Sequence, residues 1–364
     1  IWKEEYPADF FVSEEKANQH YQKLAELALK NFDEKGIDFF GYNIEEHAKD
    51  VNDLMSLLEI DKFTLFGFSY GTHIGMTVME LFPEIVERAI LVGADAPNQG
   101  LNFPSHLDAH INKIGELIEK DGSLNMTQDD FKNLVNETME KLKLNPLSVS
   151  VMNPLTKKKM NLDIGDFGLA LTLRLEIDDA NDIPIIPRLL YSIKNDEGSI
   201  LTWFIQKRVG YALQLPGQGI NQQLASGVSD ERWVQIKNEV NKSIFGNAVN
   251  FPFSAAKAVW PETQLSFDST LPVKTKIPTL FITGILDCRT PVEQVDNIME
   301  GFANASHIKV EYAGHEQAQW DIDVADKIIP AFIQGENIES GFESYSKINF
   351  IKLTGEVSGH PSIN

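Results

Sequence analysis

Hydrophobic residues in the first sixty positions recur at helical spacing. The segment 13–31 carries Tyr21 and Leu24 among its apolar positions, and Ser13 precedes its first turn. Serine is a favourable N-cap because its hydroxyl accepts a hydrogen bond from a free backbone N–H group. A second segment, 43–58, repeats the helical spacing after Asn43. We therefore predict two amphipathic helices ahead of the first strand.

Short apolar runs further along the chain predict buried strands. They are KFTLFGF (62–68), RAILV (88–92), TLFIT (279–283) and IKVEY (308–312). A helical pattern at 72–82 separates the first two runs, and another, with Val292, Val295 and Ile298, separates the last two. Continuous apolar runs are typical of parallel strands covered on both faces. The alternation predicts a doubly wound, mostly parallel sheet of the α/β class.

The segment between these strand pairs has a different character. Residues 97–267 are mostly helical in pattern and rich in polar and acidic positions, which indicates a helical cap inserted into the core. We therefore divide the chain into a first core part (1–96), the cap (97–267), a second core part (268–335) and a C-terminal extension (336–364).

Composition removes several functional classes. The chain has 364 residues, 43% of them hydrophobic, but lacks the long apolar run that a membrane-spanning helix needs. Its formal net charge of −21 would repel phosphate backbones, so we expect no nucleic-acid partner. An acidic surface that aids solubility is the favoured explanation of this charge, ahead of a role in binding cations. The single cysteine, Cys288, excludes an internal disulfide framework and does not indicate a compartment.

A nucleophile motif follows the first strand. Residues 67–71, GFSYG, fit the pattern G-x-S-x-G, in which a serine occupies a tight strand-to-helix turn. The turn would expose the Ser69 hydroxyl and direct the Tyr70 backbone N–H toward a developing oxyanion. Because the motif lies between an apolar strand and a helix, we predict that Ser69 is a nucleophile.

A serine nucleophile needs a base and an acid, and both are available after later strands. Asp287 follows the TLFIT run and His315 follows the IKVEY run, in the order Ser, Asp, His. The carboxyl ends of parallel strands meet at one sheet edge, so we expect these side chains to converge on Ser69. Asp95, after RAILV, is the alternative acid.

The sequence signal for a metal site is weaker than that for the catalytic residues. His106, Asp108 and His110 are close in sequence, but no further ligand is in register, so a solvated helix face is favoured. We expect neither a metal nor an organic cofactor.

Several segments also resemble a known family. GYNIEEHAKDVNDLMSLLEIDKFTLFGFSYGTHIG, IPTLFITGILDCRTP and YAGHEQA are similar to the nucleophile, acid and base segments of proline iminopeptidases and tripeptidyl aminopeptidase-like (TAP-like) serine peptidases. The resemblance runs from about residue 38 to 318 and implies the α/β-hydrolase fold. It also implies a peptide substrate with a free amino terminus.

The resemblance extends to the cap segment LRLEIDDANDIPIIPRLLYSIKNDEGS. In this family acidic cap residues bind the substrate ammonium group. The candidates that the resemblance implies here are Glu176, Asp178, Asp179 and Asp182. A solvated acidic loop is the default explanation of this cluster.

The chain departs from the family at its N-terminus. The family's early strands, its HGGPG-like loop, which donates a second oxyanion N–H, and its DQRG-like turn are absent. Without a strand neighbour the KFTLFGF run would become a hydrophobic sheet edge. We expect that the chain is a fragment of a longer polypeptide or that the missing strands come from elsewhere.

Together these observations predict acyl transfer to water by Ser69, His315 and Asp287, most consistent with an aminopeptidase. Two alternatives remain open: an esterase or acyltransferase with the same triad, and a hydrolase-like module that is catalytically silent.

Overall fold

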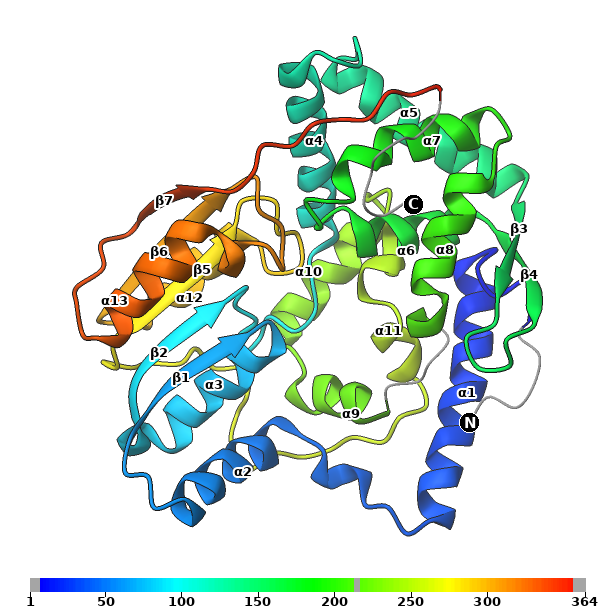
Figure 1. The fold of residues 1–364 in the computed structure, drawn as a ribbon. Coiled ribbons are helices and arrows are strands. Elements are labelled where there is room, and N and C mark those ends of the chain that lie inside the picture. The colour runs from blue at the N-terminus through cyan, green and yellow to red at the C-terminus, as the bar shows by residue number, and fades with distance from the viewer. Residues whose placement is uncertain (1–6, 213–216, 356–364) are drawn as a thin grey trace.

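A parallel sheet and a helical part form two sides of the molecule. The computed structural model describes residues 7–212 and 217–355, and for residues 210–212, 217 and 218 it describes the backbone alone. Figure 1 shows the sheet on the left, the helical part on the right, and a small hairpin beside the helices. No helix within the described ranges combines the length and apolar character needed to cross a membrane.

In the described residues the sheet has five parallel strands, in the order β1-β2-β5-β6-β7. They are β1 (Phe63–Phe68), β2 (Val86–Val92), β5 (Thr279–Gly284), β6 (Ala305–Glu311) and β7 (Gly341–Ser344). The first four lie where the apolar runs predict them, and they confirm a doubly wound α/β sheet. The fifth, in the C-terminal extension, was not predicted.

Helices cover both faces of the sheet. One face packs against α2 (Ile44–Leu57), α3 (Tyr70–Leu81) and α12 (Val292–Met299) through a hydrophobic cluster that includes Ala48, Met76 and Val295. The other face packs against α13 (Ile329–Ile333), and Phe332 belongs to its cluster. The second predicted helix is confirmed as α2, and the Asn43 side chain accepts from the Glu46 N–H.

Strand β1 lies at one edge of the sheet. Within the described residues its strand neighbour is β2, and the Phe66 side chain remains 51% exposed. The prediction that this run is covered on both faces is therefore wrong at Phe66. The apolar sequence reflects burial of Leu65 and Gly67 on the face that α3 covers.

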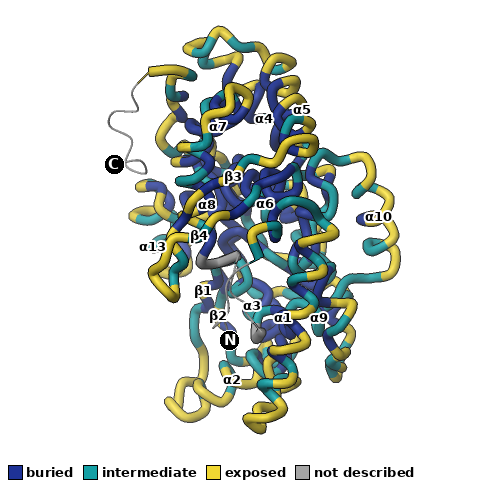
Figure 2. Tube along the Cα trace, turned by 90° about the vertical axis from the view of Figure 1, so that its right-hand side faces the viewer, coloured by how far each residue is buried: buried dark blue, intermediate teal, exposed yellow. Residues whose placement is uncertain are grey.

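Most of the chain between β2 and β5 is helical. The helices are α4 (Pro104–Asp121), α5 (Gln128–Leu144), α6 (Asp166–Glu176), α7 (Ile186–Lys194), α8 (Ser199–Ala212), α9 (Gly217–Ser226), α10 (Asp230–Val240) and α11 (Phe253–Ala256). An antiparallel hairpin of β3 (Leu147–Met152) and β4 (Lys159–Ile164) interrupts them, which the helical prediction missed. Figure 2 shows that buried segments run through the middle of this part and exposed ones along its outside.

Both terminal segments join the helical part. Helix α1 (Glu14–Glu34) begins at its predicted cap, Ser13, and buries Tyr21 and Leu24 in the same hydrophobic cluster as α4–α7. After β7 the chain crosses from the sheet to this cluster, where the Ile351 N–H donates to Pro184 O at 3.3 Å. The predicted core segment 1–96 thus contributes α1 to the helical side, while the other predicted boundaries stay predictions.

Candidate active site

Ser69 occupies a strained turn between β1 and α3. Its φ of 51° lies in the left-handed region, which is costly for a residue with a side chain. The turn is held from both sides, because the Ser69 N–H donates to Val92 O at 2.9 Å and the Thr72 hydroxyl donates to Ser69 O at 2.6 Å. In this conformation Ser69 lies directly between the carboxyl end of β1 and the first turn of α3.

The two glycines of the GFSYG turn are not equivalent. A Cβ atom on Gly67 would lie 2.6 Å from Gly71 O, whereas a Cβ on Gly71 would have no atom within 4 Å. The close approach of strand to helix therefore requires glycine at position 67. Position 71 has no such requirement within the described residues.

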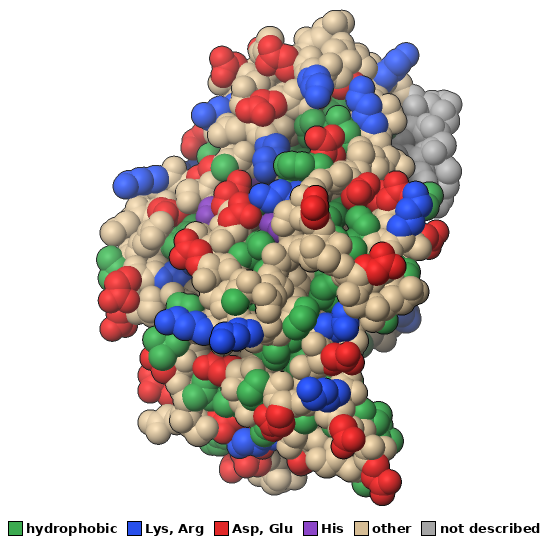
Figure 3. Space-filling model, turned by 90° about the vertical axis from the view of Figure 1, so that its left-hand side faces the viewer, with side chains coloured by type: hydrophobic (Ala, Val, Ile, Leu, Met, Phe, Trp, Pro, Cys, Tyr) green, Lys and Arg blue, Asp and Glu red, His purple; other side chains and the backbone are tan. Residues whose placement is uncertain are grey.

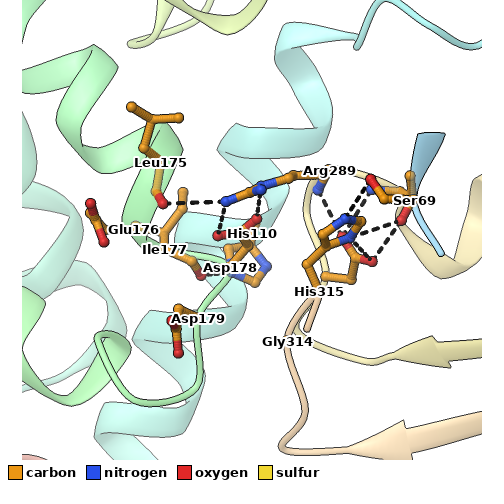
Figure 4. A network of polar contacts seen from close by, with 12 residues as sticks. Ser69, His110, Leu175, Glu176, Ile177, Asp178, Asp179, Arg289, Gly314 and His315 are labelled. Atoms are coloured by element: carbon orange, nitrogen blue, oxygen red, sulfur yellow. Dashed lines mark hydrogen bonds and ion pairs between the residues drawn. The ribbon is translucent and has the colours of Figure 1, made fainter. Parts of the chain in front are cut away.

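Asp287 and His315 reach Ser69 from the loops after β5 and β6. Those two loops are joined, since the Leu286 N–H donates to Ala313 O at 2.9 Å. His315 Nε2 lies 2.9 Å from Ser69 Oγ (Figure 4). On the other side of the ring, His315 Nδ1 lies 2.8 Å from Asp287 Oδ2. Three residues far apart in sequence thus form one continuous hydrogen-bonded relay.

Burial and mutual attraction set the pKa values of this relay. Burial alone would raise the pKa of Asp287, but attraction to His315 and hydrogen bonds outweigh it and hold the pKa below its ordinary value. For His315, burial is the largest single effect and lowers the pKa, but attraction to Asp287 and the hydrogen bond with it together raise the pKa overall. The structure therefore favours an ionised Asp287 beside a comparatively basic imidazole.

Thr290 is a further member of the site that the sequence analysis missed. Its hydroxyl donates to Asp287 Oδ2 at 2.6 Å and lies 3.2 Å from His315 Nδ1. The backbone N–H groups of Arg289 and Thr290 both donate to Asp287 Oδ1 at 2.9 Å. The signal was present in the run DCRTP, where threonine follows the aspartate by three residues.

Tyr70 begins α3. Backbone N–H groups in the first turn of a helix lack partners within the helix, so the Tyr70 N–H is available beside Ser69. Its phenol is enclosed, and burial raises its pKa. The role of the Tyr70 N–H as an oxyanion donor stays a prediction.

Asp95, the alternative acid, is near the site but outside the relay. Its backbone N–H donates to the Thr72 hydroxyl at 2.8 Å, and that hydroxyl binds Ser69 O. Burial raises the pKa of the Asp95 carboxyl to about 6, against the effects of His315 and Arg232. Asp287, not Asp95, accepts from the histidine.

Three of the four acidic cap candidates are paired with cations of the same chain. Glu176 contacts Arg208 and Lys207, and Asp182 also contacts Lys207. Asp178 pairs with Arg289. All three carboxylates are buried, so the solvated loop that the sequence favoured is wrong for them.

Asp179 differs from the other three acids. It is half-buried, and its carboxylate accepts from Gln317 Nε2 at 2.9 Å and from the Asn181 N–H at 2.9 Å. Among the described residues no cation forms an ion pair with it. Gln317 also accepts from the Gly314 N–H, so one side chain links Asp179 to the residue before His315.

The three α4 residues His106, Asp108 and His110 differ in burial, and the expected solvated face is wrong for His110, while His106 and Asp108 are half-buried. His110 is buried, and its Nε2 contacts Ile177 O at 2.5 Å. Asp108 accepts from Ser243 and Ile244. No group of residues suited to holding a metal occurs in the described parts of the chain. Acidic side chains are instead spread with basic ones over the molecular surface, as one face in Figure 3 shows.

Two family models match the chain in the segments that supply this site. The model described as alpha/beta hydrolase fold matches residues 17–140, which include Ser69. The model described as TAP-like protein matches residues 248–340, which include Asp287 and His315.

Curated relatives match over short stretches. Serine protease Hip1 of Mycobacterium tuberculosis (strain ATCC 25618 / H37Rv) is 40% identical over 79 residues, which are 20% of this chain and 15% of that protein. An uncharacterised protein of the same strain is 34% identical over 62 residues, 17% of this chain and 18% of that protein. The chain therefore matches less than a fifth of the length of each.

Solved structures match over more of the chain at lower identity. An esterase from Exiguobacterium antarcticum is 17% identical with a TM-score of 0.34, covering 81% of this chain and 75% of that one. A bromoperoxidase from Bacillus anthracis is 14% identical with a TM-score of 0.36, at 81% and 75% coverage. From its sheet and its family matches, the chain has the α/β-hydrolase fold, and the segments that carry Ser69, Asp287 and His315 are similar to an α/β-hydrolase family and to TAP-like proteins.

Proposed function

We propose that the chain is a serine hydrolase that cleaves peptide bonds near free amino termini through an acyl-enzyme. The observation that carries the proposal is the relay from Ser69 Oγ to His315 Nε2 at 2.9 Å and from His315 Nδ1 to Asp287 Oδ2 at 2.8 Å. Both distances are those of hydrogen bonds, and the first is the one along which the Ser69 proton can pass to His315.

The chemistry follows from the polarity of this relay. His315 accepts the Ser69 proton as Oγ attacks the peptide carbonyl, and the ionised Asp287 stabilises the imidazolium that forms. His315 then gives the proton to the leaving amine, whose departure leaves the acyl-enzyme. Water repeats the attack on the ester, and the same imidazole returns the proton to Ser69.

The Tyr70 N–H is the oxyanion donor in this proposal. Its place at the start of α3 also directs the positive end of the helix dipole toward the developing charge. One such donor contributes about 3 kcal/mol to transition-state stabilisation in related enzymes.

The proposal of a peptide substrate is supported by similarity and by Asp179, a carboxylate that is hydrogen-bonded but forms no ion pair among the described residues. The TAP-like match and the resemblance to Hip1, a serine protease, both favour amide cleavage. Asp179 is the candidate for holding the substrate ammonium group, because Lys207, Arg208 and Arg289 already neutralise the other three acids. The Asp179→Asn variant should raise KM for a free aminoacyl-anilide and leave an N-acetylated one unaffected.

A fluorophosphonate probe tests the nucleophile directly. We expect covalent labelling of the wild type and none of Ser69→Ala, with both proteins shown to be folded by circular dichroism. A folded wild type that does not react would refute the proposal and support a catalytically silent module.

Substrate class is tested separately from the triad. Turnover of aminoacyl-anilides should exceed that of short-chain esters relative to their uncatalysed rates. The reverse order, with probe labelling intact, would favour an esterase or acyltransferase.

A further inference from the structure

One cap residue contacts both loops that deliver the acid and the base. Asp178 follows α6, and its main-chain oxygen accepts from the His315 N–H at 2.9 Å. Its carboxylate pairs with Arg289, two residues after Asp287. We infer that Asp178 is a positioning residue through which the helical cap holds Asp287 and His315 in the geometry of the relay. This inference rests on the proposed function.

The contact with the base loop requires close approach of two backbones. A Cβ atom on Gly314 would overlap the main-chain carbonyl of Asp178, so only glycine permits this packing before His315. Gln317 reinforces it by accepting from the Gly314 N–H at 3.1 Å while donating to Asp179 at 2.9 Å. The loop of His315 is therefore fixed to the cap at two adjacent residues.

The contact with the loop of Asp287 is an ion pair between the buried Asp178 carboxylate and Arg289. The Asp178 side chain is 1% exposed, and Arg289 reaches it with Nε and with an Nη2 that lies 3.3 Å from Oδ1. The backbone N–H of the same arginine donates to Asp287 Oδ1 at 2.9 Å. Figure 4 shows Arg289 between the cap segment and the relay.

Asp178 itself is held by its neighbours in the cap. The preceding Ile177 O contacts His110 Nε2 of α4, so the loop is tied to a second helix. Arg289 Nη2 also donates to Leu175 O at 3.5 Å. Removing the partner of a buried charge is far more damaging than removing an exposed pair. Because Arg289 contacts both Asp178 and Asp287, a shift of the cap segment around Asp178 would displace the acid of the triad.

The pair also affects the charge balance around the imidazole. Burial raises the pKa of Asp178, while Arg289 and His315 lower it and Asp287 raises it. Asp178 also raises the pKa of Arg208 and of Cys288. For His315, Asp178 raises the pKa and Arg289 lowers it. Loss of the Asp178 charge should therefore make His315 less basic.

The test compares Asp178→Asn with a matched cap variant, Asp196→Asn. Asparagine keeps the main-chain carbonyl and the shape but removes the charge that pairs with Arg289. Asp196 also forms an ion pair, with Lys141 at 2.7 Å, but its side chain is 80% exposed. Fluorophosphonate labelling rates across pH, measured on the full chain, give both the rate and the apparent pKa of the base.

We expect Asp178→Asn to label at least tenfold more slowly at its pH optimum, because small displacements of reacting groups are costly. The acid limb of its pH profile should move to lower pH, since a negative charge near His315 is lost. Asp196→Asn should match the wild type in both. A folded Asp178→Asn variant with the labelling rate and pH profile of the wild type would overturn the inference. Labelling of the wild-type protein in the same experiment would still support the proposed function.

A second variant keeps the inference testable if Asp178→Asn does not fold. Arg289→Lys retains the positive charge but loses the planar fork that reaches Asp178 and Leu175 O together. We expect Arg289→Lys to be labelled more slowly than the wild type, with no shift in the acid side of its pH profile. A rate equal to that of the wild type would show that the pair serves folding alone, and would also overturn the inference. An unreactive wild type would remove both proposals together.

Discussion

The Asp287 carboxylate receives four hydrogen bonds, and one of them comes from the Thr290 side chain. Hydrogen bonds to a charged group contribute about 1.5–3 kcal/mol. Thr290→Val keeps the shape of the side chain but removes its donor. We therefore expect a decrease of roughly tenfold or more in the labelling rate of Ser69.

Thr290→Ser is the matched control, because it keeps the hydroxyl and loses only a methyl group. Its labelling rate should stay within a few-fold of the wild type. Equal rates for the valine and serine variants would show that the hydroxyl does not support Asp287.

The raised pKa of His315 predicts where activity is lost on acidification. Only the neutral imidazole accepts the serine proton, so the rate should fall as pH falls through the His315 pKa. Because Asp287 raises that pKa, the midpoint should lie above the ordinary histidine value of 6.5. Asp287→Asn removes the charge and should move the midpoint lower. A wild-type midpoint below 6.5 in labelling kinetics would contradict this assignment.

At the residue scale the sequence predicted the groups with a defined chemical order. Ser69, Asp287 and His315 follow a known sequence of motifs at strand ends, and the structure brings them together. The partners of Asp178 were not predictable, since Arg289 lies 111 residues away and the pairing depends on how the helical part packs against the sheet loops. The burial of Glu176, Asp178 and Asp182 was not predictable for the same reason, because it also depends on partners that are distant in the sequence.

Among the elements, the turn from β1 to α3 offers a sharp comparison of two glycines. Gly67→Ala would force a Cβ into Gly71 O, and overpacking of this kind costs about 1–3 kcal/mol. Gly71→Ala meets no atom and lies in a helix, where alanine is favoured over glycine by up to about 1 kcal/mol.

Denaturant unfolding of both variants measures this difference. We expect a lower midpoint for the alanine at 67 and an equal or higher midpoint for the alanine at 71. A similar loss at both positions would show that the turn, and not the strand-to-helix approach, requires glycine.

Elements with strong periodicity were predictable, and those stabilised by distant partners were not. Helix α1 and strands β2 and β5 follow directly from their patterns. Strand β7 contains only four residues, Gly341–Ser344, and is a strand because β6 lies beside it. The hairpin of β3 and β4 was missed because its alternation at 147–152 lies among longer helical patterns.

For the whole molecule, the exposed edge of β1 predicts self-association. Phe66 is 51% exposed on an edge strand whose outer backbone groups can pair with another chain. Phe66→Lys should reduce aggregation at high protein concentration, as seen by light scattering. Leu57→Lys makes the same change in charge at an 80% exposed residue of a helix and should have a smaller effect. An equal effect of the two would indicate that net charge alone controls association.

Cys288 lies between Asp287 and Arg289 and is buried in the hydrophobic cluster of the helical part. Burial, with Asp178 and Asp287 nearby, raises the pKa of its thiol well above the ordinary value. An alkylating reagent therefore meets almost no thiolate while the molecule is closed. Since the sequence contains no second cysteine, the rate of alkylation at Cys288 would measure how often the loop around this residue opens.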